Sequence, residues 1–87
     1  MSNLIIVAGS VTTASRISKK LNSYKDVFAS VIHTPSQINN SGCSYSIRTQ
    51  NKNLPLIKQL EKNNKIKYKK LYIENLQGKE YSYHDIS

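Results

Sequence analysis

A run of five apolar residues near the start of the chain places the strongest constraint on the fold. The residues from Leu4 to Ala8 are all apolar and mostly branched, which is typical of a strand covered on both faces. Such a strand lies at the centre of its sheet, so strands are expected on both sides of it. After Gly9 and Ser10, apolar residues recur every three or four positions, as in an amphipathic helix. The expected helical stripe consists of Val11, Ala14, Ile17, Leu21 and Tyr24.

The rest of the chain continues this mixture of strands and helices. Branched and aromatic residues predict strands over residues 27–34 and 44–49 and a longer strand over residues 65–76. A second helix is expected between the last two strands. It begins at Asn53, which we expect to cap it, and it ends at the Asn63-Asn64 pair, which tolerates left-handed geometry.

This order of elements predicts the ferredoxin-like split βαβ fold, an α+β domain with an antiparallel sheet and two helices on one face. A turn at Gly78 and the residues 81–84 are expected to add a short edge strand. We expect residues 1–87 to form a single domain, because no linker, repeat or low-complexity segment divides them.

The chain has a single cysteine, Cys43, at the head of the predicted third strand. In the expected fold this strand neighbours the first, which brings Cys43 close to the start of the first helix. The free N–H groups and partial positive charge of a helix N-terminus favour a thiolate over a thiol. Cys43 is therefore a candidate reactive sulfur, although inert packing stays open as an alternative. The backbone of Ser41, Gly42 and Ser44 and that of Ser10, Thr12 and Thr13 are its expected electrostatic support.

Several classes of site are excluded or disfavoured. One cysteine forms no internal disulfide, no Cys-x-x-Cys redox pair and no cysteine-based zinc site, and we expect neither a metal nor a cofactor. His33 is a conceivable partner for Cys43 at the same edge of the sheet, but an ordinary solvated histidine is favoured. With no carboxylate near the cysteine in the chain, a catalytic triad is unsupported and we expect no enzyme activity. No apolar run approaches the roughly 20 residues of a membrane span, so a cytoplasmic protein is expected.

The residues around the cysteine resemble the selenium or sulfur carrier protein-like family. In that family an Ile-Ser-Ser loop, a variable residue and Cys-Gly precede an aliphatic stretch that ends in Arg. The matching residues are Ile38, Ser41, Cys43, Ile47 and Arg48. The resemblance covers most of residues 4–74. Two features depart from the family pattern: Ser44 replaces the usual glycine, and Asn39 and Asn40 lengthen the polar part of the loop.

The resemblance implies a small bacterial protein that holds sulfur or selenium on Cys43 as a persulfide or selenosulfide. It implies a donor such as a cysteine desulfurase and an acceptor enzyme that receives the atom. This role needs a thiolate, room for the larger group and hydrogen-bond donors to stabilise its charge. Arg48 follows Cys43 by five residues, about 16 Å along a strand, so we expect it to pack, form an ion pair or contact a partner.

The formal net charge of +8 keeps a binding function open as an alternative. Lysines and tyrosines interleave in the last strands, as in surfaces that bind RNA or an acidic partner. These residues are Lys67, Tyr68, Lys69, Lys70, Tyr72, Lys79, Tyr81 and Tyr83. A solvated edge is the favoured interpretation, because lysine is common on edge strands. A homodimer that pairs through the sheet also stays open.

Overall fold

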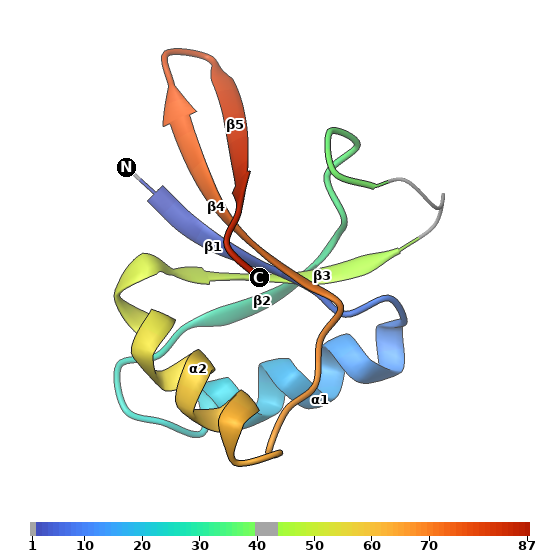
Figure 1. The fold of residues 1–87 in the computed structure, drawn as a ribbon, viewed down its shortest axis with the longest axis vertical. Helices are drawn as coiled ribbons and strands as arrows, with labels where there is room; N and C mark the ends of the chain where they lie inside the picture. The colour runs from blue at the N-terminus through green and yellow to red at the C-terminus, as the bar shows by residue number, and fades with distance from the viewer. Residues whose placement is uncertain (1, 40–43) are drawn as a thin grey trace.

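A five-stranded antiparallel sheet carries two helices on one of its faces (Figure 1). The computed structural model describes residues 2–39 and 44–87. The elements are β1 (Ser2–Val7), α1 (Val11–Asn22), β2 (Ala29–His33), β3 (Tyr45–Gln50), the 3-10 turn η1 (Asn51–Asn53), α2 (Leu54–Lys62), β4 (Lys70–Gln77) and β5 (Glu80–Asp85). The strand order is β2-β3-β1-β4-β5. The α+β, ferredoxin-like fold is therefore confirmed, with β5 as the extra edge strand.

The central strand β1 is covered on both faces, as its composition predicts. Leu4 and Ile6 pack with the helices in the main core, and both are fully buried. Ile5 points to the opposite face and is also fully buried. We call this the open face, because no helix of residues 2–39 and 44–87 covers it (Figure 1). Ile5 lies between Arg48 of β3 and Tyr72 of β4 in the register of the sheet.

The first helix buries a narrower stripe than its spacing predicts. Ala14, Ile17 and Leu21 are buried against the sheet. Val11 is 50% exposed and Tyr24 is 37% exposed, so their predicted place in the stripe is wrong. Val11 is the first residue of α1, and Tyr24 lies beyond its last residue. Apolar spacing thus reaches the first residue of the helix and continues past its last one, without burial at either position.

The second helix begins after Asn53 and ends before Asn64, as predicted, but the predicted capping bond of Asn53 is absent. The side chain of Asn53 makes no capping bond and instead donates to Thr49 Oγ1 at 3.0 Å and Gln50 Oε1 at 2.8 Å. It thereby ties the 3-10 turn to the end of β3. Asn64 has a φ of 59° just after the helix, and the Lys65 N–H donates to the Leu60 carbonyl at 2.8 Å. These contacts fix the turn that follows α2.

Two predicted strands are too long. The second strand starts at Ala29 and ends at His33, inside the predicted range of residues 27–34. The fourth starts at Lys70 rather than at Lys65, because residues 65–69 lead from the end of α2 back to the sheet. Within residues 2–39 and 44–87, no helix is long and apolar enough to cross a membrane.

Candidate functional site

Apart from Arg48, the predicted site residues that the structure describes gather at one edge of the sheet. Ser41, Gly42 and Cys43 lie outside the described residues. The described residues at this edge include Gly9, Ser10, Thr12, Thr13, His33, Thr34, Ser44, Tyr45 and Lys69. Here β1 and β2 end and α1 and β3 begin. We call this set of residues the helix-start edge.

A shared backbone acceptor joins the start of β3 to the start of α1. The carbonyl of Tyr45 accepts hydrogen bonds from Ala8 N at 3.0 Å and Gly9 N at 3.1 Å. Gly9 is followed by Ser10, the N-cap of the helix. The predicted neighbourhood of the first and third strands is therefore confirmed, and it places the strand that follows Cys43 in the sequence beside the helix N-terminus.

Ser10 caps the helix through its side chain. Ser10 Oγ accepts from Thr13 N at 3.2 Å, and its hydroxyl donates to Thr13 Oγ1 at 3.0 Å. The hydroxyl is thus engaged within the helix and is not a free donor for a ligand. The amides of Val11 and Thr12 have no acceptor within the first helical turn, and both residues are exposed. The helix therefore presents backbone N–H groups at this edge.

Three buried hydroxyl groups fix the ends of β2 and β3. Thr34 N donates to the Ser44 carbonyl at 3.0 Å, and the Thr34 hydroxyl donates to Ser44 Oγ at 3.0 Å. Ser46 Oγ lies 2.7 Å from Thr34 Oγ1, and since the Thr34 proton is used on Ser44, Ser46 is the donor. Ser44 is 6% exposed and does not adopt a positive φ. A serine therefore fits where the family usually has glycine, and its side chain anchors the strand.

His33 lies at the predicted edge but contacts an aromatic ring. Its imidazole centroid is 4.8 Å from that of Tyr45, with 35° between the planes. The two residues face each other across β2 and β3, and His33 is exposed. This arrangement agrees with the solvated histidine favoured from the sequence, while a role beside Cys43 stays a prediction.

Lys69 brings a positive charge to the helix-start edge. The sequence did not predict this position for Lys69. Its backbone N–H donates to the Val7 carbonyl at 2.8 Å. Its side chain runs over Gly9, where an added Cβ would lie 2.9 Å from Lys69 Cε and 3.1 Å from Nζ. Gly9 also has a φ of 98°, so the backbone favours glycine there, and an added side chain would in addition displace the flexible end of Lys69. The antiparallel pairing of the first and fourth strands was the available signal, because it brings the start of the fourth to the end of the first.

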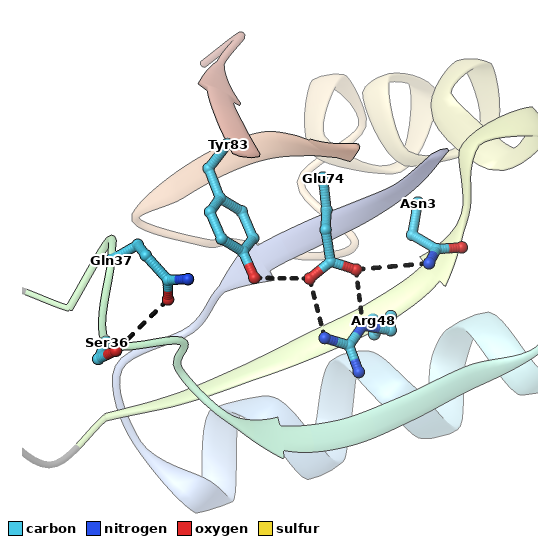
Figure 2. A network of polar contacts seen from close by, with 6 residues as sticks. All are labelled: Asn3, Ser36, Gln37, Arg48, Glu74 and Tyr83. Carbon is cyan, nitrogen blue, oxygen red and sulfur yellow. Dashed lines mark hydrogen bonds and ion pairs between the residues drawn. The ribbon is translucent and has the colours of Figure 1, made fainter. Parts of the chain in front are cut away.

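Arg48 lies on the open face in an ion pair, one of the three roles predicted for it. Its Nε and Nη2 donate to the two carboxylate oxygens of Glu74 at 2.9 and 2.8 Å. Tyr83 donates to the same carboxylate at 2.8 Å, and Asn3 donates at 3.4 Å (Figure 2). The Glu74 side chain is 1% exposed and that of Arg48 is 38% exposed. The network joins β1, β3, β4 and β5 and gives Arg48 a structural role.

Electrostatics in this network follow from burial and hydrogen bonding. Burial raises the pKa of Glu74, but hydrogen bonds from Arg48 and Tyr83 outweigh it and hold the pKa below its usual value. The hydrogen bond to Glu74 raises the pKa of Arg48. Burial, assisted by the bond to Glu74, raises the pKa of Tyr83 to about 12. All three groups keep their ordinary charge states at neutral pH, so the network is a stable ion pair with a neutral phenol.

Several of the interleaved lysines and tyrosines make contacts within the chain. The Tyr68 hydroxyl donates to Glu61 at 2.7 Å, and Lys70 pairs with Asp85 at 3.1 Å. Tyr81 lies with its ring centroid 5.9 Å from Arg48 Cζ. The sequence-based interpretation of a solvated edge agrees with the position of β5 at the end of the sheet.

The neighbouring strands β1 and β3 direct no aromatic side chain to the open face, whereas Tyr72 of β4 lies there beside Ile5. The side chains that β1 and β3 direct to the open face are those of Asn3, Ile5, Val7, Ser46, Arg48 and Gln50, by the register of the sheet. The tyrosine of β3 lies on the helix face, where it packs against the core. Within the described parts of the chain, no group of three His, Cys, Asp or Glu side chains is placed to hold a metal ion.

Comparison with protein families identifies the family of the chain. A family model described as "Putative Se/S carrier protein-like" matches residues 3–73. No curated protein and no solved structure matches the chain. The matched region runs from β1 into β4 and includes the helix-start edge and Arg48, whereas β5 with Tyr83 lies beyond it.

Proposed function

The chain belongs to the Se/S carrier protein-like family, and on that premise we propose that it carries sulfur or selenium on Cys43. The family match over residues 3–73 is the observation on which the proposal depends. The bonds from Ala8 and Gly9 to the Tyr45 carbonyl support it, since they hold the strand that follows Cys43 against the start of α1. A donor protein, an acceptor protein and a cytoplasmic location belong to the same proposal.

The proposed chemistry is an exchange that needs no external oxidant or reductant. The Cys43 thiolate attacks the outer sulfur of a persulfide on the donor's cysteine. A bond forms between Cys43 Sγ and that sulfur as the donor's S–S bond breaks, and the donor thiolate leaves with the electron pair. Delivery repeats the same exchange with Cys43 as the leaving thiolate. A selenium atom in the outer position follows the same steps.

The helix-start edge offers electrostatic support for the anions in both steps. The backbone amides of Val11 and Thr12 and the ammonium of Lys69 contribute positive potential there. Such surroundings lower thiol pKa values and stabilise a bound anion. Each exchange uses an existing thiolate as nucleophile and a thiolate as leaving group, so the proposal requires no general base and we describe the protein as a carrier rather than an enzyme.

Sulfur loading tests the proposal. The protein is incubated either with glutathione persulfide or with a cysteine desulfurase and free cysteine, and its intact mass is then measured. We expect a gain of one sulfur atom that dithiothreitol removes and that Cys43→Ser abolishes. Ser36→Ala, an exposed serine in the loop after β2, is the matched control and should load normally. The proposal is rejected if neither donor adds sulfur, or if Cys43→Ser still loads.

A further inference from the structure

A groove of about 350 Å³ lies between α1 and the segment that leads from α2 to β4. Its lining residues are Thr13, Arg16, Ile17, Asn64, Lys65, Ile66 and Lys67. Ile17 and Ile66 are 2% and 4% exposed and form an apolar floor. The remaining lining residues are polar or basic. The groove therefore has an apolar floor and a polar, basic rim.

Three positive charges stand on this rim without an acidic counterpart. Arg16, Lys65 and Lys67 are exposed, and no acidic residue lines the groove. The ion pairs in residues 2–39 and 44–87 are Arg48 with Glu74 and Lys70 with Asp85, so the three rim cations take part in neither. Their mutual repulsion is relieved only by an anionic partner or by counterions.

The rim is held in shape by the turn after α2. Asn64 adopts a φ of 59°, and the Lys65 N–H donates to the Leu60 carbonyl at 2.8 Å. Two residues beyond Lys67, Lys69 is fixed by its bond to the Val7 carbonyl. The backbone that carries Lys65 and Lys67 is therefore anchored at both ends, which reduces the entropy that binding would cost.

We infer that this groove binds an acidic segment of a partner protein, with carboxylates on the rim and an apolar side chain on the floor. The chemistry favours this occupant over RNA, because no aromatic residue lines the groove to stack a base. An acidic segment is also favoured over a free phosphate, because the rim cations are exposed rather than enclosed around one ion. The net charge of +8 makes an acidic partner the complementary one.

The groove adjoins the helix-start edge, so a partner bound in it would lie beside the proposed site of sulfur exchange. Thr13 lines the groove and is hydrogen-bonded to the helix cap Ser10. A segment bound in the groove thus places its protein beside the edge at which Cys43 is proposed to exchange sulfur. This last step rests on the proposed carrier function, whereas binding of the acidic segment does not.

Binding of a fluorescein-labelled octaglutamate peptide tests the inference. The groove variant carries Arg16→Gln, Lys65→Gln and Lys67→Gln. The control variant carries Lys25→Gln, Lys52→Gln and Lys79→Gln, three exposed lysines away from the groove. The two variants lose the same charge, so a general attraction weakens binding equally in both. We expect at least about a tenfold loss of affinity for the groove variant and no more than about twofold for the control.

Amide chemical-shift mapping of the same titration locates the peptide. We expect the largest shifts at Thr13, Arg16, Ile17 and the residues 64–67. Equal losses of affinity in the two variants, or shifts centred on the β4–β5 hairpin, would overturn the inference. Tighter binding of octauridylate than of octaglutamate, lost in the groove variant, would overturn it in favour of RNA.

A loading comparison separates this inference from the carrier proposal. Glutathione persulfide needs no docking, so the groove variant should load from it at the normal rate. Loading from a cysteine desulfurase should slow at least about fivefold in the groove variant and hardly in the control variant. If peptide binding follows the groove while neither donor loads Cys43, the carrier proposal fails and the groove assignment stands. If both variants load equally from the protein donor, the use of the groove in loading is refuted.

Discussion

Replacement of Glu74 by glutamine probes the network that joins four strands of the sheet. Its carboxylate is 1% exposed and accepts bonds from Arg48, Tyr83 and Asn3. Glutamine has nearly the same shape but only one acceptor oxygen, so one of the two bonds from Arg48 is lost and an NH₂ group faces a donor. A bond to a charged group contributes about 1.5–3 kcal/mol.

The expected magnitude is moderated by the exposure of the arginine. Because the Arg48 side chain is 38% exposed, water replaces part of what it loses, and we expect Glu74→Gln to cost about 2 kcal/mol. For a chain of this length total stability is about 4–13 kcal/mol, so the loss is large. It corresponds to a fall in Tm of about 8–16 °C. Urea denaturation followed by circular dichroism at pH 7 measures it directly.

The pH dependence of the loss identifies the ion pair as its cause. The pKa of Glu74 is lower in the folded protein than its ordinary value, so the unfolded chain binds a proton first as the pH falls. The stabilisation is therefore fully present above about pH 5 and disappears as the pH falls through the lowered folded pKa. The stability difference between wild type and Glu74→Gln should shrink accordingly.

An exposed glutamate provides the control for this experiment. Glu80→Gln at the start of β5 should change stability by less than about 0.5 kcal/mol at any pH. A difference between wild type and Glu74→Gln that stays constant from pH 7 to pH 2, or that is absent at pH 7, would refute the reasoning.

Three further predictions concern the helix-start edge. Ser10→Ala removes the helix cap and should lower stability by about 1 kcal/mol in urea denaturation; an unchanged midpoint would contradict the capping role. Gly9→Ala forces a side chain onto a φ of 98° and against Lys69, and it should cost about 1–3 kcal/mol; stability equal to wild type would show that the turn relaxes freely. Lys69→Met should slow alkylation of Cys43 at pH 7 by about two- to fivefold, because on the carrier proposal Cys43 reacts at the helix-start edge and the variant removes a positive charge from that edge; iodoacetamide measures the rate. Lys79→Met is the control, and equal rates in the two variants would argue against a role for Lys69.

The architecture could be predicted from the spacing of apolar residues, because the residues that fit each pattern are the ones the fold buries. The run from Leu4 to Ala8 predicts a central strand because both of its faces are apolar, and Leu4, Ile5 and Ile6 are all fully buried. Helical spacing correctly predicts Ala14, Ile17 and Leu21 as the buried stripe of α1. The order of these elements is enough to predict the topology, because few arrangements satisfy it.

Element ends are less predictable because the same residue types occur on both sides of them. Val11 and Tyr24 continue the helical spacing, yet one stands at the first helical position and the other beyond the last. The predicted fourth strand includes Lys65 to Lys69, whose alternating pattern resembles a strand, although these residues cross from α2 to the sheet. Tertiary contacts, rather than propensity, decide these boundaries.

In the candidate site, features that depend on the order of the elements were predicted, and contacts between side chains of distant strands were not. The approach of the third strand to the helix start was predicted, because it depends only on topology. The burial of Glu74 was not predicted, since a glutamate in a strand is ordinarily exposed and its partner Arg48 lies two strands away. The sequence placed Lys69 among the edge lysines. Its contact with Gly9 was not predicted, because that contact depends on the pairing of β4 with β1.

Labelled sulfur offers the most direct test of the central claim. The protein is loaded with a desulfurase and ³⁵S-cysteine, separated from the donor and treated with cyanide, which releases the outer sulfur of a persulfide as thiocyanate. The carrier account predicts about one releasable label per chain, and none in Cys43→Ser. Wild-type protein that acquires no releasable label, or a Cys43→Ser variant that retains it, would contradict the account.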